Sequence, residues 1–118
     1  MNDIFEKLML ILNERKNSSA EDSYVADLYS KGINKILEKV GEESTETIIA
    51  AKDLFKLINE DASNIENSRT AFTNEVADLL FHLLVLLSHL DVELEEVKAE
   101  LDRRFGISGH AEKKSRKD

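Results

Sequence analysis

The sequence predicts an all-α protein, a bundle of about four to five helices. It contains no proline and only four glycines in 118 residues, whereas turn-rich β architectures usually use more of both. Apolar residues also recur at intervals of three and four along most of the chain, which is the spacing of one face of a helix. The length suits one core, so we expect residues 1–118 to form a single domain.

Two helices are expected before residue 33. Residues 3–16 form the first, and a polar loop follows it at 17–23. Ser23 is a residue type that caps helices, so a short second helix is predicted through Tyr29, with Gly32 as its end. The apolar positions of the first helix are Ile4, Phe5, Leu8, Met9, Ile11 and Leu12.

A long amphipathic helix is expected next, over residues 33–58. The segment 59–69 is polar enough to be a loop, and residues 70–90 should form another helix. Asp91 is expected to cap a last helix, which Gly106 should end. The pattern shows no internal repeat and no linker between two domains.

Charge is distributed unevenly along the chain. The net charge is −8, from 16 basic and 24 acidic residues. Residues 109–118 hold four basic and two acidic residues, a balance of +2, which leaves −10 on residues 1–108. An acidic body argues against a general nucleic-acid or anionic-membrane surface, and it favours a metal cation as a ligand. The basic tail 109–118 suits an anionic ligand, or it is an ordinary solvated terminus.

The compartment is expected to be the cytoplasm. The chain has no cysteine, which excludes disulfides and thiolate chemistry. The first 16 residues carry acids inside their apolar stretch and no small-residue cleavage site, so they do not have the pattern of a signal peptide.

Three glutamates cluster on the long helix. On a helical wheel at about 100° per residue, Glu43 falls at the edge of the apolar arc, so it should be partly buried. Glu46 lies further round, and Glu42 is furthest towards solvent. Taken alone, the cluster also fits a solvated acidic face with an ion pair between Lys39 and Glu43.

The helix at 70–90 favours a site over a solvated face. Every residue from Leu79 to Leu87 is leucine, valine or phenylalanine except His82, so this helix should be buried nearly all round. Its polar residues fall on one narrow stripe, which contains no lysine or arginine. Buried carboxylates without a partner are costly, so this stripe either faces water or shares a cation with Glu43 and Glu46. The stripe consists of Glu75, Asp78, His82 and His89.

Four carboxylates from two helices would form an oxygen-only site. Such ligands favour Mg²⁺ or Mn²⁺ over zinc, and Mg²⁺ often completes its shell with substrate phosphates. A polyphosphate is therefore the expected ligand. A carboxylate-bridged di-iron centre is disfavoured, because no Glu-x-x-His motif follows Glu46 or Glu75. His82 is either an orienting residue or phosphate contact, or a hydrogen-bonded core histidine.

The acidic motifs carry a family resemblance. EESTE at 42–46, followed by EVAD at 75–78, resembles the signature of the all-α nucleoside triphosphate pyrophosphatase superfamily, which includes the MazG-like proteins. Within it, the segments SYVADLYSKGINKILEKVGEE at 23–43 and RRFGISGHAEKKSRK at 103–117 are similar to those of the phosphoribosyl-ATP pyrophosphatase family of histidine biosynthesis. The similarity spans nearly the whole chain and implies the MazG-like fold.

The resemblance implies hydrolysis of phosphoribosyl-ATP between its α and β phosphates, with magnesium as cofactor. Glu42 would add a ligand or act as the base that positions water. The metal ligands it implies are Glu43, Glu46, Glu75 and Asp78. The residues it implies for phosphate and ribose-phosphate contacts are Lys31, Lys39, Lys113, Ser115 and Arg116.

Two alternatives remain from the sequence. One is a house-cleaning pyrophosphatase of the same superfamily that acts on free nucleoside triphosphates. The other is a non-catalytic helical dimerisation module with solvated acids. In each case we expect a homodimer or a dimer of dimers, because the segment 79–87 is too apolar for one chain to cover. Gly41 interrupts the long helix, and we expect a neighbouring helix or the substrate to approach the backbone there.

Overall fold

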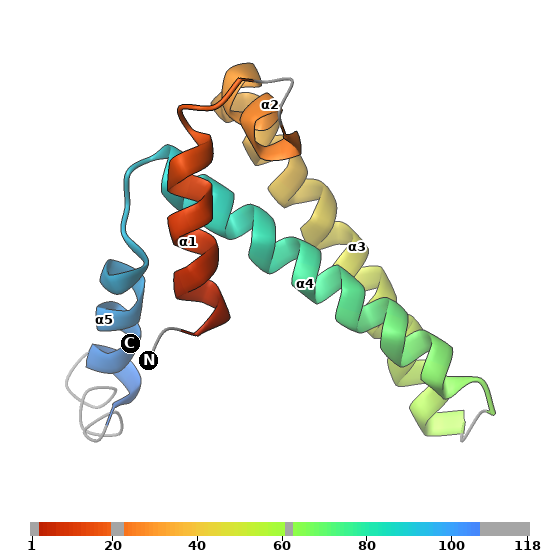
Figure 1. Ribbon diagram of the computed structural model, residues 1–118. Helices are drawn as coiled ribbons and strands as arrows, with labels where there is room; N and C mark the ends of the chain where they lie inside the picture. Colours follow the sequence, from red (N-terminus) through yellow and green to blue (C-terminus); the bar gives the residue numbers. More distant parts are fainter. Residues whose placement is uncertain (1–2, 20–22, 61–62, 107–118) are drawn as a thin grey trace.

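The computed structural model describes residues 3–19, 23–60 and 63–106, and it is all-α, as predicted (Figure 1). Five helices occur in this part of the chain, and it contains no strand. They are α1 (Ile4–Arg15), α2 (Tyr24–Lys31), α3 (Ile33–Glu60), α4 (Ile65–His89) and α5 (Leu94–Phe105).

The long helices α3 and α4 form an antiparallel hairpin that dominates the molecule (Figure 1). Helix α1 packs against the C-terminal half of α4, and α2 lies where α3 begins. Helix α5 lies beside α1, and the Lys98 side chain of α5 forms an ion pair of 2.8 Å with the Glu6 carboxylate of α1. The other half of the hairpin, made of the end of α3 and the start of α4, extends away from the other three helices and is called the free half below (Figure 1).

The core lies where α1 and α2 meet the hairpin. Ile36 and Val85 are fully buried there, with no accessible surface. By contrast, no described residue between 44 and 81 is buried. The hydrophobic core cluster comprises Met9, Leu12, Leu28, Ile36, Leu84 and Val85.

The predicted boundaries of α2 are confirmed. The Ser23 hydroxyl accepts a hydrogen bond of 3.0 Å from the Ala26 N–H, which caps the first turn. Gly32 ends the helix with a φ of +91°, a conformation that side chains disfavour. The turn leads directly into α3.

Two predicted starts are wrong. Helix α4 begins at Ile65, five residues before the predicted start, and its added turns carry Ile65, which is half-buried like Phe72 two turns later. Asp91 does not cap α5, since it adopts a φ of +57° and bonds Lys16. The cap is Glu93, whose N–H donates to the Glu96 carboxylate at 2.9 Å.

Helix α4 is less buried than the sequence predicts. Leu80 and Leu83 are 40% and 37% exposed, so the chain covers only part of the apolar segment. By length and composition alone, α4 could cross a membrane: its most apolar window of 18 residues has a mean hydropathy of 1.4. Core helices of soluble proteins meet the same criteria, and the expectation of no membrane contact stays a prediction.

Candidate active site

Glu43 joins the acidic residues of the two long helices. It is only 6% exposed, on the face of α3 that meets α4, so the predicted burial at the core edge is confirmed. One carboxylate oxygen each from Glu43, Glu75 and Asp78 lie within 4.8 Å of one another. The same holds for Glu42, Glu43 and Glu46. The two predicted acidic motifs therefore meet at a single buried residue.

Burial decreases outward from Glu43. Glu46 and Glu75 are half-buried, and Glu42 and Asp78 are exposed. Partial burial raises the pKa of Glu75, and the negative charges of Glu46, Glu43 and Asp78 raise it further. The site therefore concentrates negative charge in a place where water screens it incompletely.

Lys39 provides the positive charge at the outer side of the cluster. Its Nζ lies 2.9 Å from Glu42 and 3.7 Å from Glu43, so the expected pair with Glu43 is the longer of two contacts. The hydrogen bond from Lys39 lowers the pKa of Glu42 below its usual value. Within the described residues, no lysine or arginine forms an ion pair with Glu46, Glu75 or Asp78.

His82 is buried behind the acidic cluster, with 5% exposed. Its Nδ1 lies 2.8 Å from the backbone carbonyl of Asp78, and its Nε2 lies 2.9 Å from the Tyr24 hydroxyl. A carbonyl can only accept, so Nδ1 carries the proton. Both ring nitrogens are engaged, which favours an orienting role for His82 over direct contact with a phosphate.

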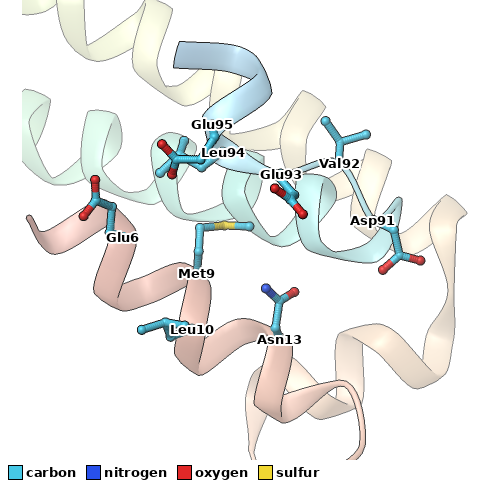
Figure 2. A pocket seen from close by; sticks show the side chains of 9 residues that line it. All are labelled: Glu6, Met9, Leu10, Asn13, Asp91, Val92, Glu93, Leu94 and Glu95. Carbon is cyan, nitrogen blue, oxygen red and sulfur yellow. The ribbon is translucent and has the colours of Figure 1, made fainter. Parts of the chain in front are cut away.

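A groove of about 650 Å³ lies elsewhere, between α1 and the segment 91–95 (Figure 2). Met9 and Leu94 form part of its floor, and acidic side chains from both sides line it. The acids are Glu6, Asp91, Glu93 and Glu95. None of the residues from the acidic cluster of α3 and α4 lines this groove.

Comparison with known proteins identifies the family. The family model for phosphoribosyl-ATP pyrophosphohydrolase matches residues 5–105. The chain belongs to this family. It is also 51% identical, over 115 residues, to a phosphoribosyl-ATP pyrophosphatase from Hydrogenovibrio crunogenus, an alignment that covers 98% of this chain and 94% of the relative. The resemblance predicted from the acidic motifs, and with it the prediction of a hydrolase, is confirmed.

Two further residues, which the sequence does not single out, form hydrogen bonds close to the acidic cluster. Tyr24 connects α2 to α4 through its hydrogen bond with His82. The Thr47 hydroxyl bonds the backbone of both long helices beside the acids. Tyr24 lies in the segment 23–43 that carries the family resemblance, but the sequence assigns it no role of its own. Nothing in the sequence distinguishes Thr47 from an ordinary helical threonine.

The other predicted site residues lie apart from the acidic cluster or outside the described residues. Lys31 is exposed at the end of α2, where it pairs with Asp27 at 2.9 Å. His89 stacks on Tyr29 with 5.9 Å between ring centroids, and it takes no part in the cluster. The predicted tail contacts Lys113, Ser115 and Arg116 lie outside the described residues.

Proposed function

We propose that the chain hydrolyses 1-(5-phosphoribosyl)-ATP between the α and β phosphates, giving 1-(5-phosphoribosyl)-AMP and pyrophosphate in the second step of L-histidine biosynthesis. The observation that carries the proposal is the meeting of Glu43 with Glu75 and Asp78 within 4.8 Å, in a chain 51% identical to a phosphoribosyl-ATP pyrophosphatase. Acids that share a face within one helix thus also lie close to an acid of the other helix, which supports the proposal.

The acidic cluster fits a divalent cation, and we propose Mg²⁺, with Mn²⁺ as a substitute. The donor set is oxygen-only, and burial together with the negative charges of its neighbours raises the pKa of Glu75. When bound, the ion would neutralise triphosphate charge and make a bound water more acidic. The residues proposed to hold it are Glu43, Glu46, Glu75 and Asp78.

Glu42 and Lys39 are proposed to act as a pair beside the metal ligands. The hydrogen bond from Lys39 lowers the pKa of Glu42 and so weakens it as a base, while the carboxylate oxygens are still able to orient a water. The Lys39 Nζ lies 2.9 Å from a carboxylate oxygen of Glu42, and a substrate phosphate would compete with that carboxylate for the lysine. Substrate binding would thereby free the base. We propose the ribose phosphate as the partner of Lys31 and of the tail residues Lys113, Ser115 and Arg116.

A second copy of the chain is proposed to cover the hairpin, as a homodimer or a dimer of dimers. Both long helices leave large apolar side chains more than one-third exposed, on faces that α1 and α2 do not cover. Contiguous surfaces of this kind mark interfaces. The exposed residues are Ile48, Ile49, Phe55, Ile58, Leu80 and Leu83.

Pyrophosphate release from three substrates tests the activity. With Mg²⁺ present, we expect turnover of phosphoribosyl-ATP and much slower turnover of ATP and dUTP, and chelation of the metal should abolish it. Equal turnover of all three would favour a house-cleaning pyrophosphatase. No turnover of any substrate would contradict the proposed function.

A further inference from the structure

Thr47 makes a polar connection between the two long helices at the level of the acids. It lies on α3, one turn after Glu43, and its half-buried hydroxyl is 2.8 Å from the Glu43 carbonyl and 3.2 Å from the Glu75 carbonyl. Carbonyl oxygens only accept, so the single hydroxyl proton is shared between the helices. The first bond is an ordinary contact with the preceding turn, whereas the second crosses to α4.

The two carbonyls belong to the residues whose carboxylates converge. A bond that fixes the Glu75 backbone against α3 also fixes the height and separation at which its side chain meets Glu43. Apolar packing leaves this level only partly closed, because the described residues between 44 and 81 are half-buried or exposed. Repulsion among Glu43, Glu75 and Asp78 acts to separate the helices at this level, and the Thr47 bond opposes that separation.

We infer that Thr47 is a positioning residue, which holds the carboxylates of Glu43 and Glu75 at cation-binding separation before the ion arrives. This inference rests on the proposed metal-dependent function. Groups that orient ligands without touching the metal typically change metal affinity by about 10- to 100-fold when they are removed. Thr47 acts on ligand backbone rather than on a ligand side chain, so the lower end of that range is expected.

The chain provides a matched control two residues earlier. The Thr45 hydroxyl donates to the Gly41 carbonyl at 3.1 Å, one turn back on the same helix, and the side chain is exposed. It has the bond to the preceding turn without the bond across to α4. Thr45→Val therefore reports what loss of a helical threonine hydroxyl does by itself.

The test is Mn²⁺ binding to the full chain without substrate, followed by electron paramagnetic resonance. Thr47→Val keeps the shape of the side chain and removes the hydroxyl, and we expect the Kd for Mn²⁺ to rise about tenfold. Thr47→Ser restores the hydroxyl and should bind as the wild type does, and so should Thr45→Val. In assays with substrate, the activity of Thr47→Val should recover at high Mg²⁺, which a general structural defect would not allow.

The outcomes separate this inference from the proposed function. If the wild type binds Mn²⁺ and Thr47→Val binds it equally well, the positioning role is wrong while the metal site stands. If the wild type binds no Mn²⁺, the metal site and the positioning role both fail. Circular dichroism melting verifies folding, and Thr47→Ala replaces any unfolded Thr47→Val. Failure of both variants to fold would assign Thr47 a structural role and overturn the inference.

Discussion

Glu43 combines a carboxyl group with near-complete burial, which is costly unless a partner is present. Its lysine neighbour, Lys39, lies closer to Glu42 than to Glu43, at 2.9 Å against 3.7 Å. On its other side stand the carboxylates of Glu75 and Asp78. The nearest positive charge is thus shared with Glu42, and the other neighbours are acidic, which is an arrangement that suits a cation.

Replacing Glu43 by glutamine keeps the shape and removes the charge. We expect Mn²⁺ affinity to fall at least about tenfold and activity at least about 100-fold, because a ligand should matter no less than the groups that orient it. Without metal, the melting temperature should not fall, since a source of repulsion is removed. Isothermal titration, steady-state kinetics and calorimetry measure these three quantities.

Glu38→Gln is the matched control for this substitution, because Glu38 is exposed five residues earlier on α3 and contacts Lys35 at 3.4 Å. It should leave all three quantities unchanged. Asp78→Asn should behave as Glu43→Gln does. Unchanged Mn²⁺ affinity in both Glu43→Gln and Asp78→Asn would support the alternative of a non-catalytic dimerisation module with solvated acids.

Tyr24 can be tested as the partner of the buried His82. Tyr24→Phe removes the hydroxyl 2.9 Å from Nε2 and leaves a buried nitrogen without its bond, which costs about 1–3 kcal/mol. Urea denaturation should show that loss in the free energy of unfolding. In a His82→Leu background the same substitution should cost little, because no nitrogen is left unpaired. An equal cost in both backgrounds would show that the bond is not the cause.

At the scale of helices, local chemistry predicted some boundaries and tertiary packing decided others. Ser23 and Gly32 mark α2 because a capping hydroxyl and a positive φ are properties of single residues. The predicted start of α4 is too late because residues 66–70 are all polar, so no apolar spacing marks the first turns of the helix. Asp91 was misassigned because its ion pair partner, Lys16, is 75 residues away in the sequence.

The candidate site follows the same division. Helical spacing within α3 and α4 predicted which carboxylates share a face. The absence of lysine and arginine from the polar stripe of α4 favoured a cation shared between the two faces. Both arguments use the residues of one helix at a time. Tyr24 and Thr47 act across helices, and the geometry of a bond between helices is absent from any one-helix pattern. The sequence therefore predicts the clustered carboxylates, but not the hydrogen bonds of Tyr24 and Thr47 between helices.

Gly41 can be replaced to test whether α3 keeps a destabilising glycine so that another molecule can approach its backbone. A β-carbon at this position would meet nothing within 4 Å, so the expected approach of a neighbouring helix does not occur within the described chain. Gly41→Ala should therefore stabilise the helix by about 1 kcal/mol. If substrate or a second copy uses the open backbone, activity or assembly falls at the same time. Chemical denaturation, kinetics and sedimentation measure the three effects. A more stable, fully active and normally assembled Gly41→Ala would remove this explanation for the glycine.

At the scale of the whole molecule, the chain is divided between a packed end and an open one (Figure 1). The core cluster ties α1 and α2 to one end of the hairpin, while the free half carries Phe55 at 59% exposed and Ile58 at 49%. The proposed metal ligands lie at the transition between the two. A partner that packs on the free half would therefore steady the helices on which the site depends, and this links assembly to activity.

Assembly is testable with charges on the exposed face of α4. Leu80 and Leu83 are 40% and 37% exposed, and changing both to glutamate would place carboxylates in the proposed interface. Light scattering should give the wild type twice the 13.4 kDa mass of one chain, or four times it for a dimer of dimers, and the double variant a lower mass. Ile4→Glu is the control, since Ile4 is 61% exposed on α1, away from the hairpin's free half. A wild type that stays at the mass of one chain would refute the assembly. An unchanged mass in the double variant would place the interface on α3 instead.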